Sequence, residues 1–303
     1  MTHRSSRDGA PALRRALLPA GVLLVPIVVA GCTGLKIGTH DFDSDVFYRS
    51  LFQPDGFIIA GVWLTIWISV VSQLIGVVLG VLGALGKMAR FLPFRIIANL
   101  YIWFFRGTPL LVQLMLVYYG IRITKLWDWP NLEIGGITIY GEVQAGIFAL
   151  GVNEGAYMTE IVRAGILSID PGQSEAGKAL GMRYGQVMRR IVLPQAARVI
   201  VPPLGNEFNN MLKTTSLLVI LGNVAELFVT FQRKNADQFL PFELFLACAL
   251  WYLLLTTVWS VIQAWIERRL GKGVAGTGGG PSLRERLFGM KQPIEPSLVS
   301  GGR

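Results

Sequence analysis

The sequence predicts an all-α integral membrane protein with five core helices and one N-terminal hydrophobic segment. Of its 303 residues, 52% are hydrophobic and only 16% are charged, whereas a soluble domain of this length carries about 25% charged residues. The chain also contains six apolar stretches long enough to cross a bilayer, which takes ~20 mostly apolar residues. These stretches are residues 16–35, 57–85, 97–121, 142–162, 199–229 and 241–266.

The basic residues orient these stretches. A net charge of +9 would suit a nucleic-acid partner if it formed one patch, but the basic residues recur in short clusters between apolar stretches. With residues 1–15 inside, twenty of the 28 Lys and Arg residues fall in cytoplasmic segments and six in extracytoplasmic ones, with Arg106 and Lys213 in neither. Basic loops stay on the cytoplasmic side, so we expect a multi-pass cytoplasmic-membrane protein with both ends inside, and no nucleic-acid partner.

The first apolar stretch has two interpretations. Two arginines, an apolar run and then Val29-Ala30-Gly31-Cys32 resemble a bacterial lipoprotein signal, in which Cys32 would be lipidated and residues 1–31 removed. The same stretch can be an uncleaved helix, although Pro19 and Pro26 weaken it as one. Both interpretations place residue 33 outside, so the topology of the remaining chain is the same.

The sequence indicates no chemistry of its own. The two cysteines, Cys32 and Cys248, and the two histidines, His3 and His40, have no spacing that fits a disulfide framework or a metal site. The phosphate-binding pattern G-x-x-x-x-G-K-S/T does not occur; around Lys87, Val81 and Met88 stand at required positions. We expect no catalytic residue, metal or cofactor in this chain, and any ATP chemistry must come from another chain.

The longest polar interruption runs from Arg163 to Arg198 and falls on the predicted cytoplasmic side. Asp170 can cap a helix whose first residue is Pro171. Gly181 can end that helix in a left-handed turn. A second helix is then expected to run as far as Pro194.

This loop resembles the EAA loop of bacterial ABC-importer permeases, whose pattern is E-A-A, three residues, G, nine residues, I-x-L-P. One position departs from the pattern, because Gly177 stands where the family usually has Ala. The resemblance implies that residues 168–195 form a coupling helix that inserts into a cleft of a partner ATPase. The matching residues are Glu175, Ala176, Gly177, Gly181, Ile191, Leu193 and Pro194.

Further motifs resemble the polar amino-acid branch (histidine, glutamine, glutamate and arginine) of these permeases, which have a MetI-like transmembrane domain. They are R-G-T-P-L-L-V-Q from Arg106, A-Y from Ala156, the single residue Glu160, R-A-G-I from Arg163, D-P-G-Q from Asp170, N-E-F from Asn206 and K-T-T-S-L from Lys213. The resemblance covers residues 57–266, between an N-terminal part (1–56: cytoplasmic N-terminus, signal or anchor, and linker) and a mobile cytoplasmic tail (267–303).

The resemblance also implies the partners and the mechanism. An ABC ATPase dimer would bind ATP and Mg²⁺, an extracytoplasmic binding protein would deliver the amino acid, and a second permease subunit, identical or paralogous, would enclose the path. Closure of the ATPases would rock the permeases between inward- and outward-facing states.

Polar residues at membrane depth are the candidate substrate path, because they are costly there. Asn153 and Glu154 lie midway along 142–162, followed by two small residues. Glu154 would recognise the ammonium group of an amino acid, which slightly favours cationic substrates; alternatively it makes a structural hydrogen bond or pairs with a base such as Arg106. Asn206, Glu207, Lys213 and Thr215 follow Pro202-Pro203, which we expect to break the fifth stretch; they would line the path or lock helices together.

A kink is expected around Thr108 and Pro109, because Pro109 cannot donate a hydrogen bond to the Phe105 carbonyl. Arg106 would contact a substrate carboxylate or, as we prefer, a lipid phosphate at the interface. Three rival functions remain: a permease for another small solute, an ion-coupled secondary amino-acid transporter, which predicts internal repeats that we do not see, and a membrane scaffold, which gives no reason for ionisable residues at membrane depth.

Overall fold

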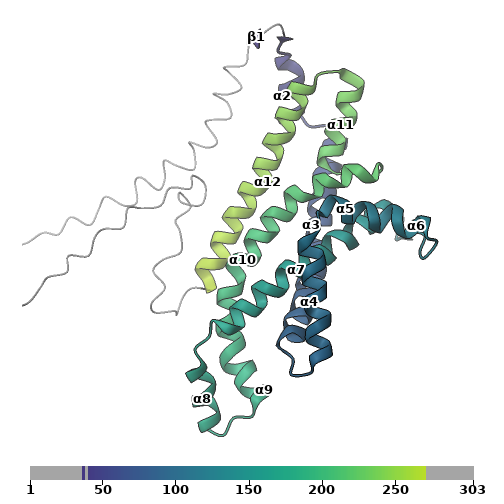
Figure 1. Cartoon of the computed structure of the whole chain (residues 1–303). Coiled ribbons are helices and arrows are strands. Elements are labelled where there is room, and N and C mark those ends of the chain that lie inside the picture. Colours follow the sequence, from purple (N-terminus) through teal and green to yellow (C-terminus); the bar gives the residue numbers. More distant parts are fainter. Residues whose placement is uncertain (1–35, 38–39, 271–303) are drawn as a thin grey trace, which may run out of the picture. The chain divides into compact units, whose positions relative to one another are not determined.

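The computed structural model describes residues 36–37 and 40–270. The first apolar stretch, Cys32 and residues 271–303 lie outside this part of the chain. The long helices are α3 (Gly56–Met88), α4 (Leu92–Gly107), α7 (Gly141–Leu167), α10 (Leu193–Thr214) and α12 (Pro241–Leu270) (Figure 1). The shorter elements are β1 (Lys36–Ile37), β2 (His40–Asp41), α2 (Ser44–Phe52), α5 (Leu110–Met115), η1 (Leu116–Gly120), α6 (Ile121–Ile123), β3 (Leu132–Ile134), β4 (Ile137–Ile139), α8 (Pro171–Ala179), α9 (Tyr184–Val187), η2 (Met188–Val192), η3 (Thr215–Leu221) and α11 (Leu227–Gln238).

Each of the five predicted core stretches overlaps one long helix, so the all-α prediction is confirmed. Among the described residues, α3 and α12 are each long and apolar enough to cross a membrane, and the number is three if the bent pair of α4 with α5–α6 is counted as one span. The helix α12 continues to Leu270, beyond the predicted start of the tail at residue 267.

The described chain forms two compact units, and each is considered by itself. The first comprises the described residues up to Arg163 together with Glu207–Thr256, and the second comprises Ala164–Asn206 together with the described residues after Thr256. Two apolar cores hold the first unit. One includes Ile68, Leu114, Leu150 and Leu218, and the other is built around Ile58, Leu227, Phe231 and Leu244.

Small residues let α3 and α7 approach each other closely. A Cβ atom on Gly76 would lie 2.6 Å from Cγ of Glu154, and one on Gly80 would overlap Met158. On the α7 side, Gly155 has no Cβ to collide with the Tyr101 hydroxyl group of α4. The small-residue spacing on residues 57–85 indicates such an approach, and α7 is the helix that uses it.

The predicted break at Pro202-Pro203 is wrong, because α10 runs through both prolines without interruption. Within the second unit, two side chains of α12 donate hydrogen bonds to carbonyls of this part of α10. Gln263 Nε2 lies 3.1 Å from the Pro202 oxygen, and Trp259 Nε1 lies 2.7 Å from the Gly205 oxygen. Neighbouring helices can thus supply hydrogen bonds around a proline that would otherwise disrupt a buried helix.

The predicted helix end at Pro194 is also wrong. The π-helical turn η2 immediately precedes Leu193, whose N–H bonds to the Met188 oxygen, and α10 then continues past Pro194. A π-turn skips one position in the hydrogen-bond ladder. Since proline has no N–H group, this wider turn allows the helix to continue where an α-helical ladder would have to end.

Candidate functional site

The predicted kink at Pro109 is a complete helix break. The helix α4 ends at Gly107, α5 begins at Leu110, and the two helical segments on either side are bent by 106°. Because Pro109 has no N–H group, the Phe105 carbonyl loses the partner that a continuous helix would supply. Such a carbonyl at membrane depth needs another donor.

Two buried amides supply that donor. Gln113 Nε2 lies 2.9 Å from the Phe105 oxygen and 2.7 Å from Thr108 Oγ1. Asn153 Nδ2 lies 3.0 Å from the same Phe105 oxygen and 2.9 Å from Gln113 Oε1. We call Gln113, Asn153, Thr108 and the Phe105 carbonyl the amide cluster. It connects the break to α7, so it holds the two helical segments at a fixed angle.

The amide cluster changes the interpretation of Asn153. Both hydrogens of its amide have partners within the chain, and its exposed fraction is 8%. Contact between Asn153 and a substrate stays a prediction, as it does for Thr108. Sequence reasoning placed Gln113 in the R-G-T-P-L-L-V-Q motif but not among the candidate site residues. One signal was available: Gln113 is the first amide side chain after Pro109, and Pro109 leaves the Phe105 carbonyl without its helical partner.

Glu154 is buried beside the amide cluster, and no ion pair found among the described residues includes it. Its exposed fraction is 6%, it packs against the bare backbone of Gly76, and the Gln73 side chain is within hydrogen-bonding reach. Glu154 Oε1 has no hydrogen-bond partner among the described residues. Among the described residues, the charged group that acts on this carboxyl is another acid, Glu207, which cannot neutralise it. Burial of an uncompensated carboxylate is costly.

The alternative pairing of Glu154 with Arg106 is not found in the described chain. Arg106 is exposed, and its guanidinium lies 5.1 Å from the centre of the Tyr157 ring, which is a cation–π contact. No ion pair joins Arg106 to Glu154 among the pairs found in residues 42–270. A structural pairing with Arg106 therefore does not explain why Glu154 is there.

The remaining candidate path residues lie along α10 and η3. Asn206 Oδ1 accepts a hydrogen bond from Gln263 Nε2 at 3.0 Å. Thr215 is fully buried, and its hydroxyl donates to the Leu212 carbonyl. Glu207 is half-buried and Lys213 is exposed. Asn206 and Thr215 therefore have structural contacts, while Glu207 and Lys213 remain open to other groups.

The loop between α7 and α10 folds into a short hairpin, which we call the EAA hairpin (Pro171–Val192). Asp170 caps α8 as predicted, with Oδ1 2.7 Å from the Gly172 nitrogen, and Pro171 is the first helical residue. Gly181 has φ +77°, in the left-handed region, which confirms the predicted turn. Bonds from the Met182 nitrogen to the Gly177 oxygen and from the Gly181 nitrogen to the Lys178 oxygen close the helix end.

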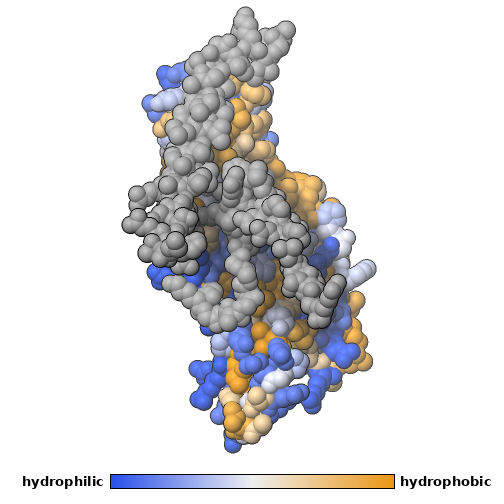
Figure 2. Space-filling view, turned by 90° about the vertical axis from the view of Figure 1, so that its left-hand side faces the viewer, coloured by the Kyte–Doolittle hydropathy of each residue, from blue (hydrophilic) through white to orange (hydrophobic). Residues whose placement is uncertain are grey.

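The two faces of α8 differ. Gly177 is buried, and a Cβ atom there would lie 2.9 Å from Ile191 Cδ1 and 3.0 Å from Val187 Cγ2. Glu175 and Ala176 are exposed, as are Leu193 and Pro194 beyond the hairpin. The lower end of Figure 2 shows hydrophilic patches beside apolar ones, and Leu180 and Tyr184 in this region are strongly exposed. One face of α8 therefore packs on the second helix, and the other is open to a partner.

The comparisons with known proteins agree with this geometry. Residues 76–272 match the family described as "Binding-protein-dependent transport system inner membrane component". The chain belongs to this family. It is 41% identical over 213 residues to the arginine transport system permease protein ArgU of Corynebacterium glutamicum, an alignment that covers 69% of this chain and 66% of ArgU. It is 36% identical over 213 residues to the glutamine transport system permease protein GlnP of Escherichia coli, covering 70% and 92% of the two chains.

Solved structures give the same result for this inner-membrane component. A chain from a crystal structure of an amino acid ABC transporter with histidines superposes with a TM-score of 0.65 and 36% identity. That match covers 77% of this chain and all of the other. A MetNI methionine ABC transporter in an inward-facing conformation matches with a TM-score of 0.55 and 19% identity, which supports the fold alone.

One ion-pair group of this permease was not predicted, although Glu160 and Arg163 belong to a sequence motif. Glu160 of α7 accepts from Arg163, with Nη2 3.0 Å from Oε2, and also pairs with Lys87 near the end of α3. These three side chains are only partly exposed. The carboxylate therefore joins the ends of two helices, and no spacing in the sequence indicates a pair between residues 87 and 160.

Proposed function

We propose that this chain is the permease subunit of an ATP-driven importer that carries polar amino acids across the bacterial cytoplasmic membrane. The observation that carries the proposal is the similarity, over more than two thirds of the chain, to permeases named for arginine and for glutamine transport. The chain has its own exposed, capped EAA hairpin, which suits contact with a separate ATPase. The permease itself performs no enzymatic step.

The partners follow from the family and the hairpin. An ABC ATPase dimer, which binds ATP and Mg²⁺, would dock at residues 168–195, with Glu175 and Ala176 on the exposed face of α8. An amino-acid-binding protein would deliver the substrate outside. A second permease subunit, either a second copy or a paralogue, would complete the path. The ends of the chain, residues 1–56 and 267–303, would add a signal or anchor and a cytoplasmic tail.

Glu154 is the proposed contact for the cationic group of the substrate. It is buried at membrane depth, and its Oε1 atom has no partner in the described chain. No ion pair of the described residues includes it. An ammonium or guanidinium group would supply the missing charge and the missing hydrogen bonds. This requirement favours cationic amino acids over neutral ones.

The decisive experiment is uptake of a panel of labelled amino acids by the complete complex reconstituted in vesicles. We expect ATP-dependent uptake of at least one polar amino acid, which Glu154→Gln abolishes while the complex still assembles. Gln keeps the size of the side chain and removes only the charge. Uptake of metal chelates or phosphate alone, or uptake driven by an ion gradient without ATP, would favour the rival functions.

Docking of the ATPase has its own test. Glu175→Trp places a bulky side chain on the exposed face of α8, and Gln238→Trp places one at the exposed end of α11 as a control. The first variant should lose ATPase co-purification and uptake, and the second should keep both. Normal co-purification with Glu175→Trp would contradict the proposed docking face.

A further inference from the structure

The element η3 (Thr215–Leu221) is a long 3₁₀-helix. It has seven residues, whereas 3₁₀ runs longer than about four residues are uncommon because their hydrogen bonds are poorly aligned. It follows α10 without a break and ends at Gly222, which has φ +86°. A 3₁₀ stretch that continues an α-helix often marks a hinge. Other contacts of the segment must therefore hold η3 in this form.

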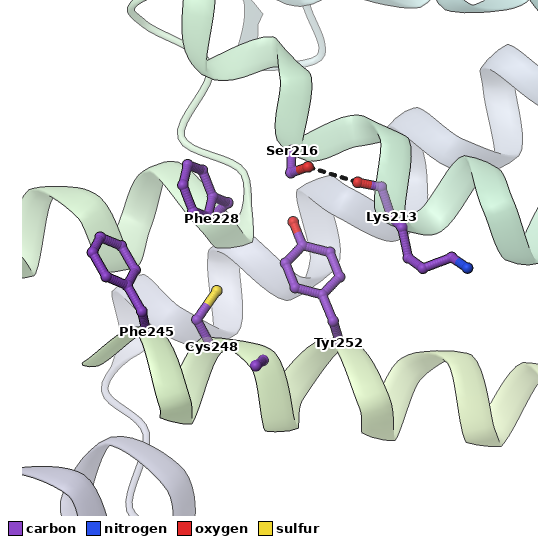
Figure 3. Close-up of a pocket in the computed structure, with 7 residues that line it drawn as sticks. Lys213, Ser216, Phe228, Phe245, Cys248 and Tyr252 are labelled. Atoms are coloured by element: carbon purple, nitrogen blue, oxygen red, sulfur yellow. Dashed lines mark hydrogen bonds between the residues drawn. The ribbon is translucent and has the colours of Figure 1, made fainter. Parts of the chain in front are cut away.

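Three consecutive hydroxyl side chains support the change from α10 to η3. An α-helix bonds each N–H to the carbonyl four residues back and a 3₁₀-helix to the carbonyl three residues back, so the junction leaves a carbonyl without its backbone donor. The hydroxyl oxygens donate to carbonyl oxygens at this junction, in the pairs Thr214–Asn210 at 2.8 Å, Thr215–Leu212 at 2.9 Å and Ser216–Lys213 at 2.7 Å. Figure 3 shows the last of these bonds as a dashed line. The K-T-T-S-L motif thus stabilises the start of η3.

The core side of η3 repeats every three residues. Thr215, Leu218 and Leu221 are buried, and the residues between them are partly exposed. Side chains three residues apart lie directly above one another in a 3₁₀-helix, so these three form one stripe. On α7, Gly146 leaves the space for this stripe, because a Cβ atom there would lie 2.8 Å from Leu218 Cδ2. The packing therefore fits the 3₁₀ form.

The sequence of η3 also suits an α-helix. Residues 217–221 (Leu-Leu-Val-Ile-Leu) are all apolar, so a change of helical period still places an apolar stripe on the core side. Leu217 and Ile220 already pack against the same apolar core. On another side, Ser216 lines a pocket of about 320 Å³ where α10, η3, α11 and α12 meet (Figure 3). Side chains on that side can turn without displacing a packed neighbour.

Conversion to an α-helix would change the length of the segment. A 3₁₀-helix rises about 2.0 Å per residue and an α-helix about 1.5 Å. Over the seven residues of η3, the difference is a shortening of ~3.5 Å. A helix that continues from η3 would have to move by this amount.

The end of η3 toward α11 is held in place. The Tyr119 hydroxyl lies 3.1 Å from the Ile220 oxygen, and the Leu227 nitrogen at the start of α11 lies 3.1 Å from Thr65 Oγ1 of α3. The other end continues into α10, whose first residue follows the EAA hairpin. Shortening of η3 therefore moves α10 rather than α11, and Gly222, with open space around it, can take up the accompanying rotation.

We propose that η3 is a segment of adjustable length, which changes from the 3₁₀-helix described above to an α-helix when the partner ATPases close on ATP. The change lets α10 follow the EAA hairpin by ~3.5 Å while α11 keeps its bond to α3. This inference rests on the proposed function, because the displacement reaches α10 from ATPases docked on the hairpin. The K-T-T-S-L motif then serves the conformational change, whichever amino acid is carried.

The test is cross-linking of cysteine pairs in the complete permease–ATPase complex. Ser216→Cys is combined with Val219→Cys or with Ile220→Cys, and Cys248→Ala removes the native thiol that lines the same pocket. Side chains three residues apart are adjacent in both kinds of helix, but side chains four residues apart are neighbours only in an α-helix. A short bifunctional methanethiosulfonate reagent bridges neighbouring thiols, and mass spectrometry of the peptide 214–233 measures the yield.

A non-hydrolysable ATP analogue with Mg²⁺ should raise the yield of the 216–220 bridge relative to the 216–219 bridge about tenfold, which corresponds to ~1.4 kcal/mol. The matched control lies on α11, where Arg233→Cys is paired with Ala236→Cys or with Asp237→Cys at exposed positions. Its ratio should not respond to the nucleotide. An unchanged ratio in η3, in a complex that transports an amino acid, would overturn the proposal. Absence of ATP-dependent uptake by wild type would instead contradict the proposed function.

A second comparison uses the hydroxyl groups at the junction. Thr214→Ala removes one supporting hydrogen bond, so the relative yield of the 216–220 bridge without nucleotide should rise about threefold. Thr124→Ala is the matched control, because the Thr124 hydroxyl makes the same kind of bond to the Gly120 carbonyl at the end of α6. An equal response to the two substitutions would mean that the hydroxyl groups do not favour the 3₁₀ form.

Hydrogen exchange of the unsubstituted chain tests the same change without cysteines. The hydrogen bonds of an α-helix are better aligned than those of a 3₁₀-helix, so the η3 amides should exchange about tenfold more slowly with the nucleotide analogue. Equal exchange with and without the analogue would contradict the change of helix type.

Discussion

The EAA hairpin and the amide cluster both solve the problem of a helix that ends, but they do so with different partners. In the hairpin, Asp170 and Gly181 close α8 through bonds to residues at most five positions away. At the break between α4 and α5, the Phe105 carbonyl is satisfied by Gln113 and by Asn153, which is 48 residues away. An exposed helix end can use local caps and water, whereas an end at membrane depth must take its partners from other helices.

This difference predicts where substitutions are most damaging. A local cap can be replaced by water when it is lost, but a buried amide leaves its partners without hydrogen bonds. The amide cluster should therefore control the stability of the protein, while the EAA hairpin should control transport with little effect on stability.

The largest effect is expected for Gln113→Leu. The change removes the hydrogen bonds that Gln113 donates to the carbonyl and hydroxyl oxygens of Thr108, and the one that it accepts from Asn153. Gln113 is only 3% exposed, so water does not replace these bonds. The free energy of unfolding should fall by at least about 2 kcal/mol, since each unsatisfied buried group costs ~1–3 kcal/mol. Equilibrium unfolding of the purified permease measures this change.

A double-mutant cycle and a control sharpen the result. Asn153→Leu combined with Gln113→Leu should cost less than the sum of the two single variants, because both remove the same contact. Gln238→Leu, at the exposed end of α11, should change stability by less than about 0.5 kcal/mol. Strict additivity of the two cluster variants would show that the amides act independently.

The same contrast explains what the sequence reveals. The caps at Asp170 and Gly181 are predictable because donor and acceptor are neighbours in the chain. The break at Pro109 is predictable from proline chemistry, but Gln113 and Asn153 as its partners are not, because their meeting depends on how α7 packs. The two wrongly predicted helix ends have a common cause, because in both cases local proline chemistry predicts an end that the fold prevents. At Pro202-Pro203, hydrogen bonds from α12 support the helix, and at Pro194 a π-turn lets it continue.

In the hairpin, Gly181→Val should abolish uptake without preventing membrane insertion. A β-branched residue at φ +77° is strained by ~1–2 kcal/mol, so the end of α8 should shift away from its docking geometry. Gly56→Val is the control, because Gly56 lies outside the hairpin, at the start of α3, with open space around it. Vesicle uptake normalised to the amount of inserted protein measures the effect. Equal uptake by the two variants would contradict the importance of this turn.

Gly177 provides a smaller and more specific test. Gly177→Ala adds one methyl group against the flexible ends of Ile191 and Val187, and the helix propensity of Ala offsets the crowding by ~1 kcal/mol. Uptake and stability should therefore stay close to wild type. Gly177→Val, with two more methyl groups, should lose about 1 kcal/mol or more and reduce uptake. Thermal unfolding and uptake of both variants check this. A clear loss of stability or uptake in Gly177→Ala would mean that the two hairpin helices cannot move apart at all.

The smallest effect concerns an ion pair outside both regions. Lys234 Nζ lies 2.6 Å from Oδ2 of Asp55, the residue that caps α3. Partial burial opposes the charged form of Asp55, but Lys234 and the Ile58 and Phe57 nitrogens outweigh it and hold the pKa of Asp55 below its usual value. The stabilisation is therefore complete above the unfolded pKa of ~3.9 and is lost as the pH falls through the lower folded pKa. Since the pair is partly exposed, Asp55→Asn should lower the free energy of unfolding by less than about 1 kcal/mol at pH 7 and by almost nothing at pH 2–3.

Thermal unfolding at both pH values measures this change. The control is Asp128→Asn, which removes the more exposed ion pair with Arg122. An equal loss at both pH values would mean that Asp55 acts as a neutral cap and that its charge contributes nothing.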